Sequence, residues 1–268
     1  MSGSLEPAPL LRVAHGARLV QGTLLGRRKR FLADVRLTDG RDVVAHCVNP
    51  GQMEGLVRPG ARVWLSEAPL DGSRKLTHTW ELVEHDGRLV GANTLAANRI
   101  ARGLLEHGCL RGLARHDELR AERRYGENSR VDFWLREGNR EHYVEVKNCH
   151  LVYPDGRAYF PDSPSERATR HLRELVDVVT GGQRATVLFV VQDPSARAVR
   201  PSDLHDPTFA EAARWAQAHG VRFRAVRVRP TRRAYAVDRC IPVDLAPYAS
   251  ARLQRFRVDN APWSGSRW

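Results

Sequence analysis

Hydrophobic and polar positions alternate in short runs along the first third of the chain. These runs are rich in Val, Leu and Thr and have the period of two that is typical of half-buried β-strands. They cover residues 19–25, 31–37, 42–48, 61–66 and 76–84. Asp39-Gly40, between the second and third runs, is a strong hairpin signal. Five short strands without a long amphipathic helix predict a small, partly open β-barrel, of which the OB-fold is the nucleic-acid-binding type.

Beyond residue 91 the pattern changes to strands that alternate with amphipathic helices. Ser163-Pro164-Ser165-Glu166 has the form of a capping box with proline at the first helical position, and Gly181-Gly182 would end that helix. The predicted order is a helix over 95–105, strands over 119–125, 130–135 and 143–146, a loop over 153–162, the capped helix to about residue 180, a strand over 185–191, a helix over 208–219 and a strand over 222–228. The sequence therefore predicts an α/β domain after the barrel.

The two patterns meet in a polar stretch, residues 84–91, which we interpret as a domain boundary. We therefore expect an N-terminal extension over 1–17, an OB-like barrel over 18–90, an α/β domain over 91–246 and a C-terminal tail over 247–268. The tail places Tyr248, Phe256, Trp263 and Trp268 among arginines, so it is either a docked extension or a flexible anchoring arm.

Acidic side chains and one lysine occupy the polar face of a strand-like run in the second domain. In residues 142–147, Val144 and Val146 point to one face, while Glu145 and Lys147 point to the other. Asp132 lies in the preceding strand, and turn-forming residues between the two runs predict a hairpin that brings it towards Glu145.

Two carboxylates on adjacent strands repel each other unless a cation lies between them. A hard divalent cation, Mg²⁺ or Mn²⁺, is suited to such oxygen ligands and usually keeps several waters. A metal-bound water can attack a phosphodiester, and Lys147 would hold that water or the phosphate. The simpler alternative is that Asp132 ends a strand and Glu145 pairs with Lys147 or an arginine. A glycosidase-like carboxylate pair fits the neighbouring lysine less well.

The chain is strongly basic, with a formal net charge of +12 over 268 residues and a pI near 10.4. Of its 43 basic residues, only Lys29, Lys75 and Lys147 are lysines. This charge favours a polyanionic partner, either DNA or RNA. The dominance of arginine is also what a GC-rich genome produces, and acidic membrane surfaces remain an alternative. Neither strandedness nor oligomeric state follows from the sequence.

Cysteine spacing and the lack of long apolar runs predict a cytoplasmic protein without a membrane partner. Cys47, Cys109, Cys149 and Cys240 have neither metal-finger nor thioredoxin spacing, so we expect buried or inert thiols. The first residues lack a signal-peptide pattern, and no segment approaches the ~20 apolar residues that a membrane helix needs.

A cluster of cations beside an aromatic residue is the main candidate for nucleic-acid binding in the barrel. It consists of Arg27, Arg28, Lys29, Arg30 and Phe31. The cations would contact phosphates, and Phe31 could stack on a base, as OB surfaces do with single strands. The alternative is a charged turn with Phe31 in the barrel core, and we favour the core position for Phe31.

Further residues could support the acidic pair. Glu122 precedes Asp132 on the neighbouring strand and either extends the site or is a surface carboxylate. Arg167, with Arg170 and His171 near the capped helix, could hold phosphate, although a solvated basic helix face is the commoner meaning. Gln192 ends a strand. Among these residues, we expect Arg167 to support the site in preference to His171 or Gln192.

The motifs together resemble known families. Asp132 followed by Glu145-Val146-Lys147 on successive strands is similar to the PD-(D/E)XK nuclease core. From about Leu19 to Leu245 the chain resembles the sugar fermentation stimulation protein (SfsA) family. The matching stretches are residues 30–35, 46–53, 59–64, 78–82, 93–95 with Asn98, 125–126, 129–133, 145–147, 160–162, 166–167 and 171–175.

The resemblance implies an OB-like N-terminal domain, a PD-(D/E)XK nuclease-like α/β domain and DNA binding. It implies that Asp132, Glu145 and the Val146 carbonyl are metal ligands and that Lys147 is the catalytic lysine. Two departures affect only neighbouring detail. Val48-Asn49-Pro50-Gly51 replaces the usual Pro-Asn-Thr-Gly, and Ala168 replaces a usual glycine.

Two functions are consistent with these features. The first is a DNA-binding protein with a divalent-metal-dependent nuclease site. The second is a non-catalytic DNA-binding regulator of sugar (maltose) metabolism on a nuclease-like scaffold. The intact Asp, Glu and Lys set favours the first, because binding alone needs no acidic cluster facing a polyanion.

Overall fold

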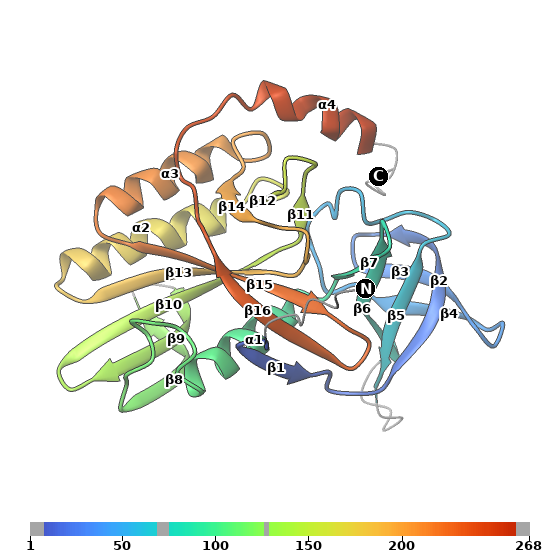
Figure 1. Cartoon of the computed structure of the whole chain (residues 1–268), viewed down its shortest axis with the longest axis horizontal. Coiled ribbons are helices and arrows are strands. Elements are labelled where there is room, and N and C mark those ends of the chain that lie inside the picture. The colour runs from blue at the N-terminus through green and yellow to red at the C-terminus, as the bar shows by residue number, and fades with distance from the viewer. Residues whose placement is uncertain (1–7, 69–74, 126–128, 261–268) are drawn as a thin grey trace, which may run out of the picture.

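The two larger β-sheets of the described residues lie next to each other, one forming a small barrel and the other a sheet covered by helices (Figure 1). The structure, a computed structural model, describes residues 8–68, 75–125 and 129–260. Trp263 and Trp268 of the predicted tail therefore lie outside the described residues. None of the described helices is both long and apolar enough to cross a membrane.

The barrel contains the five strands that the alternating pattern predicts. They are β2 (Leu19–Arg28), β3 (Leu32–Leu37), β4 (Asp42–His46), β5 (Arg62–Glu67) and β6 (His78–His85). Neighbouring strands pair antiparallel, and a parallel pairing of β4 with β6 closes the barrel. Alternate residues of β3, including Ala33 and Val35, point into a core around Trp80. A Cβ on Gly22 of β2 would lie 2.5 Å from Val35 Cγ1 of the neighbouring β3, so the glycine leaves room for the Val35 side chain.

The polar stretch between the domains is a hairpin. Strand β7 (Arg88–Gly91) pairs antiparallel with β6 across a turn in which Asp86 and Gly87 have positive φ angles of 48° and 74°. The polar residues are those of the turn, whereas Val90 is fully buried. The backbone N–H of Gly91 donates to the Gln192 carbonyl of the second domain, so no free linker separates the two sheets.

The second sheet has seven strands in the order β1-β16-β15-β13-β10-β9-β8. The predicted strands are confirmed as β8 (Glu118–Tyr125), β9 (Ser129–Glu137), β10 (Arg140–Cys149), β13 (Arg184–Val191) and β15 (Arg222–Pro230). Strands β10, β13 and β15 are parallel at its centre. The sequence pattern missed β16 (Ala234–Ile241) and β1 (Leu11–Ala14), which pair at the edge and recruit part of the N-terminal extension into this sheet.

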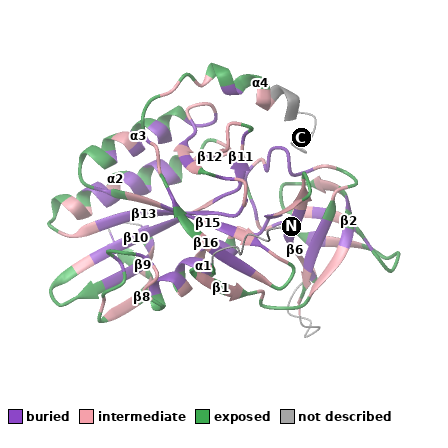
Figure 2. Cartoon of the chain, viewed as in Figure 1, coloured by how far each residue is buried: buried purple, intermediate pink, exposed green. Residues whose placement is uncertain are grey.

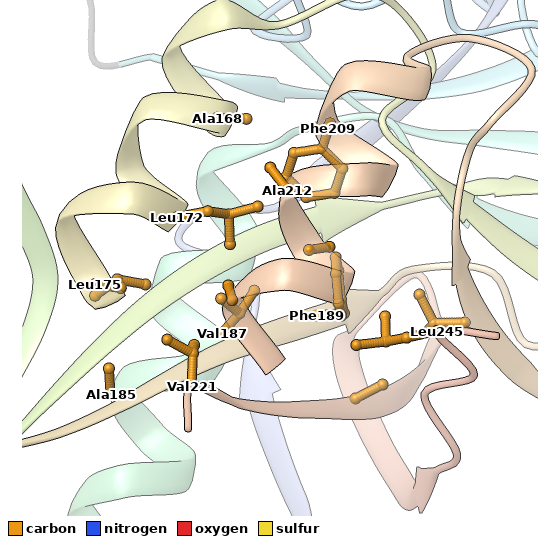
Figure 3. Packing of buried hydrophobic residues seen from close by; sticks show 14 of the residues in the cluster. Ala168, Leu172, Leu175, Ala185, Val187, Phe189, Phe209, Ala212, Val221 and Leu245 are labelled. Atoms are coloured by element: carbon orange, nitrogen blue, oxygen red, sulfur yellow. The ribbon is translucent and has the colours of Figure 1, made fainter. Parts of the chain in front are cut away.

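Helices cover both faces of this sheet, and buried residues concentrate between the layers (Figure 2). Helix α1 (Leu95–Glu106) lies on one face. Helices α2 (Glu166–Thr180) and α3 (Pro207–Ala218) lie on the other. Figure 3 shows Leu172 of α2 and Phe209 of α3 directed towards Val187 and Phe189 of β13. The apolar face of α2, which the sequence predicts to be an amphipathic helix, thus packs on the sheet.

Helix α2 begins later than the predicted capping box. Its N-cap is Ser165, whose hydroxyl accepts a hydrogen bond from the Ala168 N–H at 3.2 Å, and Ser163 and Pro164 precede the helix. A contact from another part of the chain explains the shift. The Ser165 N–H donates to Asp206 Oδ2 at 2.8 Å, and this holds the chain extended up to Ser165.

The predicted loop over 153–162 is partly a strand, and part of the predicted tail is a helix. Strands β11 (Leu151–Val152), β12 (Arg157–Phe160) and β14 (Ala198–Pro201) form a small third sheet. Helix α4 (Ala251–Asn260) packs on it through Leu253, which is buried with Tyr153 and Tyr159. The described part of the tail is therefore docked. Such short strands carry too little periodicity to be found from sequence.

The four cysteines are free thiols in different environments. Cys47 and Cys149 are buried, Cys109 is half-buried and Cys240 is exposed.

Candidate active site

The strands that contain the acidic residues separate beside the candidate site. Pairing between β9 and β10 ends at Phe133 and Val144. Beyond that pair, Asp132 Oδ2 accepts a hydrogen bond from the Val146 N–H at 2.7 Å. The carboxylate thus takes the place of a backbone acceptor and holds the diverging strands together. The hairpin brings Asp132 to the strand that contains Glu145.

Asp132 is held by neutral donors. Its second oxygen accepts from Asn98 Nδ2 of α1 at 2.8 Å. Burial, together with the negative charge of Glu145, raises the pKa of Asp132 to about 6, although the hydrogen bonds from Val146 and Asn98 oppose that rise. Ionised Asp132 is therefore costly in the protein alone, and a nearby cation would relieve that cost.

Glu145 is held by charged or polarised donors instead. The residue is 3% exposed, and its Oε1 accepts from Lys147 Nζ at 2.7 Å and from His171 Nδ1 at 2.5 Å. Burial would raise the pKa of Glu145, but Lys147 and His171 outweigh it and lower this pKa to about 2. Oε2 is buried without a hydrogen-bond partner among the described residues. A buried carboxylate oxygen in that state is costly, so Oε2 is suited to a ligand.

The helix α2 residue that reaches the acidic pair is His171, not the Arg167 that the sequence favoured. His171 is 3% exposed and contacts Glu145 directly. Arg167 lies one turn earlier on the same face, where its Nε donates to His171 Nε2 at 3.5 Å. With the histidine proton on Nδ1, the two contacts form a chain from Arg167 through His171 to Glu145.

A third carboxylate and a tyrosine lie close to the pair. Burial raises the pKa of Tyr125 above its ordinary range, and the charges of Glu145, Glu174 and Asp132 raise it further. Glu174 follows His171 by three residues, so both are on one face of α2. Sequence reasoning assigned no role to Tyr125, Glu174 or Asn98; helical spacing from His171 was the available signal for Glu174.

Two predicted supporting residues lie away from these contacts. Glu122 is exposed at an irregularity of β8, where its φ is 55°. Gln192 is fully buried at the domain junction, and its Nε2 donates to the Asn93 carbonyl at 3.0 Å and to Asn148 Oδ1 at 2.5 Å. A Cβ on Gly91 would lie 2.1 Å from Gln192 Oε1, so the glycine permits this junction.

Two arginines of the predicted nucleic-acid motif have partners within the barrel. Arg28 pairs with Asp34 at 2.9 Å on the surface. The Arg27 guanidinium turns towards the loop that follows β4, and burial lowers its pKa. It donates at 2.6, 2.9 and 3.2 Å to the carbonyl oxygens of Asn49, Gly51 and Gln52.

The rest of that motif is a turn. Lys29 and Arg30 have positive φ angles of 51° and 60°, and both are exposed. Phe31 is 48% exposed, so the prediction that it lies in the barrel core is wrong. The inward positions of β3 begin at Ala33, two residues later, because Phe31 is still part of the turn.

The loop that departs from the family pattern packs against the second domain. A Cβ on Gly51 would lie 2.3 Å from Asp162 Oδ1, and the Met53 N–H donates to Asp162 Oδ2 at 3.0 Å. Glycine is therefore required at position 51 for this approach. Ala168, the other departure, is buried in the core beneath α2.

Two family models match the chain. The model described as SfsA N-terminal OB domain matches residues 25–92. The model described as Sugar fermentation stimulation protein RE domain matches residues 95–234. The chain belongs to the SfsA family. Both the predicted family and the predicted succession of an OB barrel and an α/β domain are confirmed.

Other members of the SfsA family are similar over nearly their whole length. The sugar fermentation stimulation protein homolog of Thioalkalivibrio sulfidiphilus is 45% identical over 229 residues, which are 85% of this chain and 96% of that protein. The homolog of Brucella anthropi is 44% identical over 229 residues, 84% of this chain and 97% of that protein. The structure of Pyrococcus furiosus SfsA in complex with Ca²⁺ has a TM-score of 0.79 at 25% identity, covering 89% of this chain and 100% of that chain.

The donor set fits a hard divalent cation that retains waters. Within the described ranges, no three His, Cys, Asp or Glu side chains are arranged as a ready-made metal cage. Among the described residues, however, Glu145 Oε2 has no hydrogen-bond partner, and burial raises the pKa of Asp132 to about 6, so each carboxylate offers an oxygen that a cation would stabilise. Mg²⁺ is commonly bound by one or two carboxylates plus waters and phosphates, and this site resembles that arrangement.

Proposed function

We propose that this SfsA family protein binds DNA and hydrolyses its phosphodiester bonds with a divalent cation, Mg²⁺ or Mn²⁺, at Asp132 and Glu145. The observation that supports it most directly is that the buried Glu145 Oε2 has no hydrogen-bond partner in the described part of the chain and lies next to a carboxyl whose pKa is raised to about 6. The likeness of Asp132, Glu145 and Lys147 to the PD-(D/E)XK pattern supports the same chemistry. The related archaeal SfsA was solved in complex with Ca²⁺, another oxygen-ligated cation.

Each residue has a defined role in this proposal. Asp132, Glu145 and the Val146 carbonyl would hold the cation, which when bound polarises phosphate oxygens and lowers the pKa of a coordinated water. Lys147, whose Nζ is 2.7 Å from Glu145 Oε1, donates to the phosphate or the attacking water. His171 orients Glu145, and Asn98 orients Asp132. Supporting contacts of this kind typically change metal affinity 10- to 100-fold.

The nucleic-acid partner is supported by charge and fold. The net charge of +12 attracts polyanions, and OB barrels commonly bind nucleic acid. We take DNA as the partner and RNA as the alternative. Four free thiols fit a reducing compartment, and we propose the cytoplasm.

A second candidate is DNA binding without cleavage, in a regulator of sugar metabolism. It is favoured by the relatives' description as sugar fermentation stimulation proteins. It is also favoured by the hydrogen bonds from Lys147 and His171 to Glu145 Oε1, because such contacts can stabilise the fold without any catalytic role.

Cleavage assays on matched variants separate the two candidates. Purified protein is incubated with labelled single- and double-stranded DNA and RNA in Mg²⁺, Mn²⁺ or EDTA. We expect metal-dependent cleavage that falls by about 10²- to 10³-fold, an effect typical of lost transition-state electrostatics, in Asp132→Asn and Lys147→Ala. The matched control is Asp177→Asn, which makes the same chemical change as Asp132→Asn at an exposed position of α2.

The same samples provide a readout that does not depend on activity. Mg²⁺ or Mn²⁺ should raise the thermal midpoint of the wild type, because a ligand that binds only the folded state stabilises it. Glu145→Gln should abolish that rise. Tight DNA binding with neither cleavage nor a metal-dependent midpoint would establish the regulatory candidate instead.

A further inference from the structure

A groove of about 1060 Å³ lies where the barrel meets helix α1. Barrel strands β4, β5 and β6 form one wall, and the first turns of α1 form the other. The residues that matter below are His46 from the barrel, Leu95 and Arg99 from α1, and Lys75 from the segment before β6. This surface is distinct from the motif at residues 27–31.

The cations of the groove are available to a ligand. Arg99 and Lys75 are exposed, and neither forms an ion pair with another residue in the described ranges. A Cβ on Gly16 would lie 3.2 Å from Arg99 Nη1, so glycine leaves room for the guanidinium beside the N-terminal segment. His46 is also exposed. This contrasts with Arg27 and Arg28, whose donors are occupied.

One of the two acidic residues of the groove is buried and hydrogen-bonded within the protein, and the other is exposed beside a histidine. Glu81 is 6% exposed; its Oε1 accepts from Ser66 Oγ at 2.8 Å and its Oε2 from Asn93 Nδ2 at 2.9 Å. Glu67 Oε1 lies 3.5 Å from His78 Nε2. The exposed side chains that carry a full charge in the groove are therefore Arg99, Lys75 and Glu67. Two of these three charges are positive, so the groove favours an anion.

An exposed apolar side chain lies beside these cations. Leu95 is 61% exposed although it begins a helix whose opposite face is buried. Val48 lines the groove next to it, and its carbonyl accepts from Thr94 Oγ1 at 3.0 Å. Apolar surface next to phosphate-binding cations suits a ligand that has both charged groups and flat apolar faces. A nucleic-acid single strand presents both, whereas a duplex hides its base faces by stacking.

Helix α1 connects the groove to the candidate active site. Asn98 donates to Asp132 Oδ1, and the adjacent Arg99 lines the groove. Leu95 precedes Asn98 by three residues and Arg99 by four, so it lies on the helix surface between the two. A strand that leaves Asp132 along α1 would pass Leu95 and reach Arg99.

We propose that this groove binds a single-stranded segment of nucleic acid adjacent to the cleavage site. Arg99 and Lys75 contact phosphates, and Leu95 contacts a base. The groove volume of about 1060 Å³ is at the upper end of the range for small-molecule pockets, roughly 300 to 1,000 Å³, which suits a few nucleotides of one strand. The inference rests on the proposed function in taking that strand to be the substrate of the Asp132 and Glu145 site.

Binding in EDTA tests the groove without requiring cleavage. Fluorescence anisotropy is measured for the full-length protein with a labelled single strand and with the duplex of the same sequence, over a series of salt concentrations. The variants are Arg99→Glu and Lys75→Glu. The matched control is Arg111→Glu, an identical charge change at an exposed arginine beyond the C-terminal end of α1. Thermal midpoints confirm that each variant is folded.

We expect each groove variant to weaken single-strand binding about tenfold, the size of one lost charged hydrogen bond. The slope of log K against log salt should become shallower by about 0.7 per lost phosphate contact on a single strand. Duplex affinity should change no more than in Arg111→Glu. The inference is overturned if the groove variants match the control on single strands, if duplex binding suffers more, or if the wild type does not bind single strands at low salt.

Failure of the groove and failure of the nuclease site give different results. Loss of single-strand affinity in Arg99→Glu, with no metal-dependent cleavage by the wild type, would keep the groove and reject the nuclease. Cleavage that depends on Asp132, with single-strand binding unchanged in Arg99→Glu, would keep the nuclease and reject the groove.

Discussion

At the scale of single residues, the two carboxyl groups of the candidate site have pKa values shifted in opposite directions. Glu145 accepts hydrogen bonds from Lys147 and His171, whereas the donors to Asp132 within the described ranges are the Asn98 amide and the Val146 backbone N–H. Their pKa values accordingly move apart, to about 2 for Glu145 and about 6 for Asp132. The pair thus contains one carboxylate that is ionised at every ordinary pH and one whose ionisation depends on its surroundings.

Asp132→Asn should change how stability depends on pH. Because the folded-state pKa of about 6 exceeds the ordinary 3.8, the folded protein binds this proton more tightly than the unfolded chain. The ionisation penalty is absent below about pH 4 and complete above about pH 6. In EDTA, the wild type should therefore lose on the order of 2 kcal/mol relative to Asp132→Asn between these pH values, measured by urea unfolding.

A control of opposite sign accompanies that measurement. Asp42 is paired with Arg36 at the surface, and hydrogen bonding to Arg36 lowers the pKa of Asp42. The wild type should gain stability relative to Asp42→Asn as pH rises through about 4. A pH-independent difference between wild type and Asp132→Asn would contradict the assigned electrostatics of the site.

At the scale of elements, the position of helix α2 depends on a contact between two helix starts. Asp206 caps α3 by accepting from the Phe209 N–H at 2.9 Å, and its other oxygen accepts from the Ser165 N–H. One carboxylate therefore anchors both helices at the same end. This sets the first turn of α2 and with it the place of His171 over β10.

Ser165→Ala should destabilise the protein more than Ser163→Ala. Ser165 Oγ accepts from the Ala168 N–H, and losing such an N-cap costs about 0.5 to 2 kcal/mol. Ser163 lies before the helix, and we expect less than about 0.5 kcal/mol there. Chemical denaturation of both variants measures the difference. The reverse order would show that the sequence-predicted capping box is the real helix start.

At the scale of the whole molecule, a buried polar cluster joins the two domains. Glu54 of the barrel loop is 4% exposed and accepts from Tyr153 Oη and from His205 Nε2, both at 3.0 Å. The Tyr153 ring also contacts the ring of Phe256 of α4 in a tilted arrangement, with 5.8 Å between the ring centroids. The barrel, the α/β domain and the C-terminal helix therefore meet at one place.

Glu54→Ala should strongly lower the stability of the folded protein. It leaves Tyr153 and His205 buried without their acceptor, and breaking a buried pair costs about 3 to 5 kcal/mol. We expect a lower midpoint in thermal unfolding followed by circular dichroism. Glu106→Ala removes an exposed ion pair with Arg102 and should cost less than about 0.5 kcal/mol. Equal effects of the two changes would mean that the domains do not depend on this junction.

Local patterns of the sequence determined the barrel strands, the main helices and the central strands of the second sheet. They also determined that Glu145 and Lys147 share a face opposite Val144 and Val146. Side-chain direction in a strand follows from the backbone itself, so a single run of residues is enough to predict it.

Only the tertiary structure decided which distant groups meet. His171 and Asn98 belong to helices on opposite faces of the sheet, and nothing in their local sequence indicates that they contact Glu145 and Asp132. The same holds for Arg27, whose charge predicted a nucleic-acid contact but whose donors are taken by loop carbonyls. These outcomes depend on long-range packing and on competition for hydrogen-bond partners, which hydrophobic periodicity does not encode.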